Sequence, residues 1–181
     1  SGVNWAVNIM PVRMLDDQGA GTEFDAANAI RYAVRNGARV INLSFAGNEA
    51  HTALQNAVKD AYAKGVVVVA AMGNDARNTN TNPVYPACLR TTDDDWVIGV
   101  TAIDHTNHGA SFTNYGTVCA DVAAPGTNVY GLAYQNGSEG FLDGYQGGWN
   151  GTSMAAPLVA GAAALLLSHY PTLSAADVRN I

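Results

Sequence analysis

The chain has 181 residues, of which 48% are hydrophobic and 13% charged, so it is long enough and apolar enough to bury one sizeable core. Its net charge is −6 and its nine basic residues form no cluster, which argues against a nucleic-acid partner. The longest apolar run is about 14 residues, shorter than the roughly 20 that a membrane span needs, so no membrane anchor is expected. The chain opens on Ser1 without a signal-peptide pattern, which predicts an interior piece of a longer protein.

The first 75 residues predict strands that alternate with helices. Short apolar runs predict buried strands at 8–15, 40–44 and 66–71. Helical spacing predicts helices at 24–36 and 51–64, each ended by a glycine, and the first helix would bury the stripe Phe24, Ala27, Ile30 and Val34. This order predicts an α/β fold in which helices pack on the faces of a parallel sheet.

The second half of the chain adds two strands, a hairpin and a long helix. Strands are expected at 96–102 and 122–126, and a hairpin over 129–145. Nearly every residue from Met154 to Leu167 is apolar, so we expect this helix to be buried all round, with Pro157 in its first turn. Ser174 is expected to cap a final short helix.

Polar residues gather where functional groups are expected in such a sheet. Two strands end in the polar segments 42–47 and 71–75, and the carboxyl ends of parallel strands are where sites form. Ser153 stands at the N-terminal end of the long helix, where unpaired N–H groups and the helix dipole would stabilise a developing oxyanion. A serine there is on its own more often an ordinary N-cap, so the other motifs decide between the two interpretations.

Three separated segments resemble the subtilisin-like serine protease family. They are VINLSFAG at 40–47, VAAMGN at 69–74 and GTSMAAP at 151–157, supported by DVAAPG at 121–126. The resemblance runs over essentially the whole chain and implies a three-layer α/β/α fold with a mostly parallel sheet, incomplete at its N-terminal side. It implies that Ser153 is the nucleophile, and that Asn74 donates to the oxyanion together with the backbone N–H of Ser153.

The resemblance also assigns residues to substrate binding. It implies that Ser44, Phe45 and Ala46 form an edge that pairs with the backbone of a protein or peptide substrate. It implies that Ala71, Met72 and Gly73 form a wall of the specificity pocket. Small residues on that wall would admit a large apolar side chain from the substrate.

The family's Asp-Thr/Ser-Gly and His-Gly-Thr motifs, which carry the rest of the catalytic triad, are missing from this chain. The one His-Gly pair, at His108, falls in a predicted surface turn. A serine without an adjacent base is a weak nucleophile. We therefore expect residues 1–181 to be the C-terminal part of one catalytic domain, nearly inert alone, with Asp and His on a preceding segment.

Calcium and a disulfide are two further implications of the resemblance. The family can hold a weak cation site, here Asp121 with Ala87, and calcium suits such oxygen ligands; an ordinary strand-end Asp121 is the other interpretation. Spacing alone leaves Cys88 and Cys119 free or bonded, whereas the resemblance places them near each other and favours a disulfide. A secreted protein would follow from the family and this bond.

Two functions of different classes remain at this point. The first is a serine endopeptidase that uses Ser153 and Asn74. The alternative is a non-catalytic subtilase-like domain that keeps only the peptide-binding edge at 44–46. A nucleotide-binding α/β domain is excluded, because no glycine-rich loop follows the first predicted strand.

Overall fold

The computed structural model describes residues 2–91, 94–140 and 142–181, and within them a parallel sheet forms the centre of the fold. Its strands are β1 (Val40–Leu43), β2 (Val67–Ala71), β3 (Ile98–Ile103) and β4 (Val122–Pro125), hydrogen-bonded in the order β1-β2-β3-β4. Every neighbouring pair is parallel, with Val40 opposite Val67, for example. The parallel sheet predicted from the strand and helix order is confirmed.

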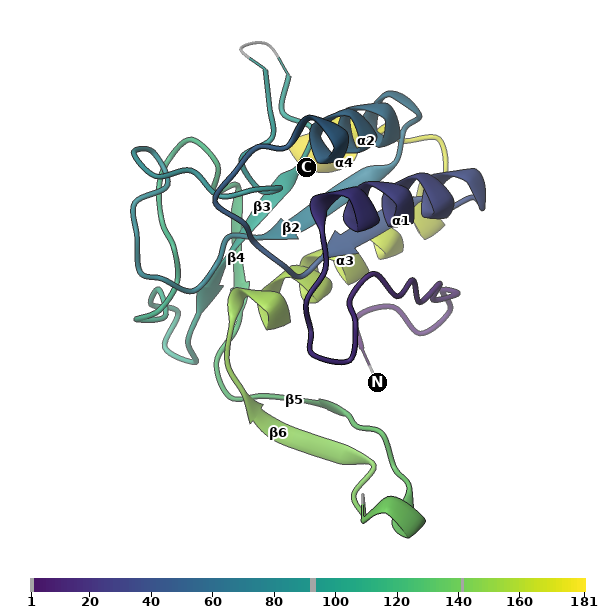
Figure 1. The fold of residues 1–181 in the computed structure, drawn as a ribbon, viewed down its shortest axis with the longest axis vertical. Coiled ribbons are helices and arrows are strands. Elements are labelled where there is room, and N and C mark those ends of the chain that lie inside the picture. The colour runs from purple at the N-terminus through teal and green to yellow at the C-terminus, as the bar shows by residue number, and fades with distance from the viewer. Residues whose placement is uncertain (1, 92–93, 141) are drawn as a thin grey trace.

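Helices cover both faces of this sheet and give three layers (Figure 1). α1 (Glu23–Arg35) and α2 (Thr52–Ala63) pack on one face, and α3 (Thr152–His169) and α4 (Ala175–Asn180) on the other. β2 is buried on both sides, which is why its sequence is apolar without alternation. Val68 and Ala70 belong to the core under α1 and α2, whereas Val67, Val69 and Ala71 belong to the core under α3.

An antiparallel hairpin leads from the sheet to α3. It consists of β5 (Val129–Leu132) and β6 (Tyr145–Trp149), joined through the short 3₁₀ turn η1 (Gly137–Glu139). The hairpin projects away from the three layers (Figure 1), and all five residues of β6 are exposed. A hairpin is therefore present, but it extends beyond the predicted range 129–145, because its second strand begins at Tyr145 and ends at Trp149, close to the turn that carries Ser153.

Two details near the N-terminus differ from the sequence prediction. Residues 8–15 form no strand, and they are exposed or half-buried. A strand needs a hydrogen-bonded neighbour, and in the described residues none pairs with this segment. Phe24 is 62% exposed, because α1 turns Ala26, Ala27, Ile30 and Ala33 toward the core.

α3 is less buried than its apolar composition predicts. Only Thr152, Ala155, Ala156, Ala163 and Leu167 are buried, whereas Pro157 and Leu165 are exposed. By length and composition this 18-residue helix could cross a membrane, a test that core helices of soluble proteins also pass. α3 contacts all four strands of the sheet, as a core helix does. Pro157 is the sixth residue of the helix and therefore lies beyond its first turn.

A disulfide links Cys88 to Cys119, with 5.0 Å between their Cα atoms, as the resemblance implied. It joins the segment before β3 to the segment before β4 and closes a loop between positions 31 residues apart. β3 runs beneath this bond at Gly99, where a Cβ atom would lie 1.9 Å from the carbonyl oxygen of Cys119. Close packing at the disulfide thus requires glycine at this position.

Candidate active site

Ser153 lies in the first turn of α3, and a glycine sets the direction of the chain that enters it. Gly151 is buried and has φ +152°, where side chains are rarely accommodated. A Cβ atom on it would lie 3.3 Å from Nδ2 of Asn74. Its N–H donates to the carbonyl of Gly126 at 2.8 Å, which fixes the turn to the end of β4. The glycine of the GTSMAAP motif therefore places Ser153 beside Asn74.

Ser153 and Ser44 hold each other through two hydrogen bonds. Oγ of Ser153 donates to the carbonyl oxygen of Ser44 at 3.1 Å, and Oγ of Ser44 donates to the carbonyl oxygen of Ser153 at 3.0 Å. The second bond exists because Pro157 has no N–H to donate to the Ser153 carbonyl within the helix. The segment after β1 is thereby joined directly to the nucleophile candidate.

The side chain of Asn74 is held in one orientation by Thr152. The backbone N–H and the hydroxyl of Thr152 donate to Oδ1 of Asn74 at 2.9 and 3.0 Å. A backbone N–H needs an acceptor, so the amide oxygen must face Thr152 and the NH₂ group must face away. Nδ2 of Asn74 has no partner among the described residues, so it is free to donate to a substrate oxygen.

Thr152 is a site residue that sequence reasoning did not assign. It is fully buried, and its hydroxyl also accepts a hydrogen bond from the N–H of Gly73 at 3.0 Å. Its place directly before the serine, at the start of an apolar helix, is the sequence signal that could have identified it. A buried hydroxyl there needs partners, and Asn74 and Gly73 supply them.

A cavity of about 230 Å³ brings most of the predicted residues together. It is lined by Phe45, Ala46, Ala71, Gly73, Asn74, Asp75, Thr152 and Ser153. Ser44 is absent from the lining but bonded to Ser153. Met72 differs from the prediction: its side chain is fully buried in the core under α1 and α2, because alternation along the strand turns it away from Ala71 and Gly73.

The cavity contains the hydroxyl of Ser153 and the free amide donor of Asn74, but no histidine. None of the four histidines lines it. Nδ1 of His108 lies 2.8 Å from the hydroxyl of Thr106 in an exposed turn, and His51 lies 3.4 Å from the carboxylates of Glu23 and Glu49. The only hydrogen bond of the Ser153 hydroxyl within the described residues goes to a carbonyl, so it lacks an activating partner there.

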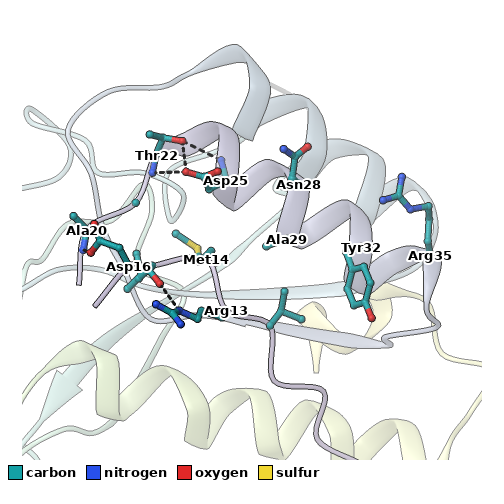
Figure 2. Close-up of a pocket in the computed structure, with 13 residues that line it drawn as sticks. Arg13, Met14, Asp16, Ala20, Thr22, Asp25, Asn28, Ala29, Tyr32 and Arg35 are labelled. Carbon is teal, nitrogen blue, oxygen red and sulfur yellow. Dashed lines mark hydrogen bonds between the residues drawn. The ribbon is translucent and has the colours of Figure 1, made fainter. Parts of the chain in front are cut away.

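A larger cavity, of about 860 Å³, lies elsewhere, between α1 and the extended segment that precedes it (Figure 2). Arg13 and Tyr32 are on opposite sides of it, and the hydroxyl of Thr22 is already bonded to Asp25 in the N-terminal capping box of α1. Its lining contains no serine, cysteine or histidine. Size alone therefore does not identify the candidate site, because it is the smaller cavity that contains the Ser153 hydroxyl and the Asn74 amide.

The residues at Asp121 do not fit a cation. One carboxylate oxygen accepts the N–H of Gly99 at 2.7 Å and the other is bonded to the guanidinium of Arg179. Arg179 also lies 2.8 Å from a carboxylate oxygen of Asp95, so a positive charge is already present. Burial raises the pKa of Asp121, while the Gly99 N–H and the charge of Arg179 act in the opposite direction. No group of three or more acidic, histidine or cysteine side chains that could hold a metal occurs in the described residues.

Known proteins match this chain both in sequence and in fold. The Subtilase family matches residues 1–181. The chain is 44% identical to subtilisin DY of Bacillus licheniformis over 180 residues, 99% of this chain and 61% of that protein. It is 43% identical to thermitase of Thermoactinomyces vulgaris, covering 90% of this chain and 52% of that protein.

Solved structures give the same result. A cold-adapted subtilisin-like serine proteinase superposes with a TM-score of 0.84 at 32% identity, covering 99% of this chain and 60% of that one. A lanthipeptide protease superposes with a TM-score of 0.82 at 26% identity, covering 98% of this chain and 62% of that one. The chain thus spans less than two thirds of the length of each of these proteins. In sequence along its whole length and in fold, the chain belongs to the subtilase family.

Proposed function

We propose that this chain is the part of a serine endopeptidase that carries the nucleophile and the oxyanion hole. The observation that carries the proposal is the arrangement around Asn74, whose amide oxygen is held by Thr152 so that Nδ2 is left to donate beside Ser153. Attack of the Ser153 hydroxyl on a peptide carbonyl would place negative charge on the carbonyl oxygen. The Asn74 amide and the Ser153 N–H would then stabilise that charge without having to reorient.

The base and its orienting carboxylate would come from a preceding segment of the same protease, which is the first partner of this chain. Support comes from the absence of a histidine in the lining of the cavity and from the resting bond of Ser153 to a carbonyl. A histidine brought within hydrogen-bond distance would take the place of the Ser44 carbonyl as acceptor and remove the hydroxyl proton during attack. Alone, the chain would be nearly inactive.

The second partner would be a protein or peptide with a large apolar residue before the scissile bond. Ala46, Ala71 and Gly73 have small side chains or none, so they would leave room in the cavity for a large apolar side chain of the substrate. The 44–46 segment would pair with the substrate backbone. The disulfide supports function outside the cytosol, in secreted form. Calcium at Asp121 and Ala87 has no part in the proposal, because protein donors already bond both Asp121 oxygens. Nucleic acid and membranes have none either, since the net charge is −6 and the hydrophobic helix α3 packs on the sheet.

The test is labelling with a fluorophosphonate probe, followed by mass analysis of the labelled peptide. In the longer protein that includes the preceding segment, we expect Ser153 to be labelled and the Ser153→Ala variant to stay unlabelled. A Ser174→Ala variant is the matched control, since Ser174 caps α4 outside the cavity and its loss should leave labelling unchanged.

Each outcome decides between the functions. If Ser153 of the longer protein stays unlabelled while an extended peptide still binds, the chain belongs to a peptide-binding domain and not to a protease. If the 181-residue chain alone is labelled as fast as the longer protein, one of its own four histidines is the base and the preceding segment is not needed.

A further inference from the structure

Asn114 is a fully buried polar residue far in sequence from the catalytic motifs. It lies between β3 and β4. Its Nδ2 donates to the carbonyl of Met72 at 2.7 Å, and its Oδ1 accepts from the N–H groups of Asp75 and Arg77 at 3.0 and 3.1 Å. Its own backbone N–H donates to the carbonyl of Gly73 at 3.0 Å. All four bonds go to one segment, residues 72–77.

These bonds lie on both sides of Asn74. Two of them hold carbonyls that precede Asn74, and two hold N–H groups that follow it. Gly73, with φ +89°, turns the chain directly against the Asn114 amide: a Cβ atom on Gly73 would lie 2.6 Å from Nδ2 of Asn114. The path of the backbone through Asn74 is therefore set by contact with the Asn114 side chain.

We propose that Asn114 is a positioning residue of the oxyanion hole, an inference that rests on the proposed protease function. Thr152 orients the Asn74 amide, and Asn114 places the backbone from which that amide extends. An oxyanion donor acts only within a narrow distance of the oxygen, about 2.7–3.1 Å. Loss of the Asn114 amide would leave the N–H groups of Asp75 and Arg77 without acceptors and let the loop shift, which weakens transition-state stabilisation.

The expected signature is a loss in kcat with little change in KM. The 44–46 segment, to which we assign pairing with the substrate backbone, has no hydrogen bond to Asn114, and the bond between Asn114 and Gly73 of the pocket wall uses only the backbone N–H of Asn114, which a substitution keeps. In the longer protein, with a peptide p-nitroanilide as substrate and rates expressed per Ser153 labelled by fluorophosphonate, Asn114→Ala should lower kcat about tenfold or more and change KM less than about twofold. Expressing rates per labelled site removes the contribution of unfolded protein.

A matched control removes the same kind of bond elsewhere. Oδ1 of Asn80 accepts from the N–H groups of Thr117 and Val118, both at 3.0 Å, and these bonds do not involve residues 72–77. Asn80→Ala should therefore leave kcat within about twofold of the original value. An equal loss of kcat in both variants would mean that any loosened loop slows the reaction, and would overturn the proposal.

A double-mutant cycle with Asn74→Ala tests whether Asn114 acts through Asn74. Asn74→Ala alone should lower kcat on the order of 10²–10³-fold, the loss found for this donor in a subtilisin. In that background Asn114→Ala should cost less than about threefold, because the donor that it positions is gone. The same fold loss in both backgrounds would show a merely structural role.

Two further outcomes are distinguishable. If Asn114→Ala does not fold, Asn114→Ser is used in the cycle, since it keeps a polar but uncharged side chain at this buried site while it removes the amide that spans Met72, Asp75 and Arg77; the same coupling is expected and its absence overturns the proposal. If Asn74→Ala leaves kcat unchanged, the oxyanion assignment itself fails, and the proposed function with it.

Discussion

Removal of the Cys88–Cys119 disulfide should lower the stability of the chain by several kcal/mol. The bond joins positions 31 residues apart, and the loop-closure entropy that it removes from the unfolded state corresponds to about 3.7 kcal/mol at 25 °C. Both cysteines are buried, at 8% and 4% exposure, and an alanine keeps only Cβ, so the loss of each single sulfur atom adds a smaller packing cost in the same direction. The entropic term should therefore dominate in a Cys88→Ala/Cys119→Ala variant.

Urea unfolding followed by circular dichroism measures this difference. The variant should unfold at a lower urea concentration. In a separate thermal unfolding experiment, its midpoint temperature should be lower by roughly 7–15 °C for a chain of this length. Dithiothreitol should destabilise the original protein by a similar amount and leave the variant unchanged, which is the internal control. A difference below about 1 kcal/mol, or a variant that still responds to the reductant, would refute the reasoning.

Three more predictions concern single side chains. Gly99→Ala should prevent folding or cost several kcal/mol, since its Cβ would lie 1.9 Å from the carbonyl oxygen of Cys119. Gly137→Ala is the control, because no atom lies within 4 Å of the added Cβ and the urea midpoint should change little. Equal effects of the two substitutions would contradict the packing described. Arg179→Gln removes the ion pairs with Asp95 and Asp121 and should lower the free energy of unfolding by roughly 1–2 kcal/mol. The loss is smaller than for a fully buried pair because the Arg179 side chain is 21% exposed, and it should shrink in about 1 M salt. A loss that salt does not change would argue against the ion pairs. Hydrogen bonds from Thr106 and from the backbone lower the pKa of Asp104 to about 2, so this carboxylate contributes stability above its unfolded pKa of 3.8 that is lost as the pH falls through 2. Thr106→Val should move that pKa toward 3.8 in an NMR titration of the carboxyl carbon, and an unmoved titration would disprove the assignment.

Local signals in the sequence were sufficient for most of the secondary structure. The run from Val67 to Ala71 is apolar without alternation because both of its faces are buried, and that pattern is readable without any neighbour. Ser174 caps α4 as predicted, in a capping box with Asp177, since such a cap depends only on residues three positions apart. The GTSMAAP motif likewise predicted that Ser153 starts the long helix.

Tertiary structure decided the features that depend on contacts between distant segments, which are strand pairing, helix burial and side-chain direction. Residues 8–15 have the composition of a strand but no strand beside them in the part of the chain that the structure describes, and α3 has the composition of a core helix but keeps residues such as Pro157 and Leu165 exposed. Met72 lies between two cavity-lining residues, yet strand alternation turns it into the opposite core.

The candidate site shows the same division. The sequence by itself predicted which side chains could react, because the motifs that contain Ser153 and Asn74 are local and resemble those of one family. Only the fold brought Thr152 against Asn74 and Asn114 against residues 72–77, across separations of 78 and about 40 residues. Hydrogen bonds between residues so far apart in the sequence depend on how the sheet and its loops pack, so local sequence patterns do not predict them.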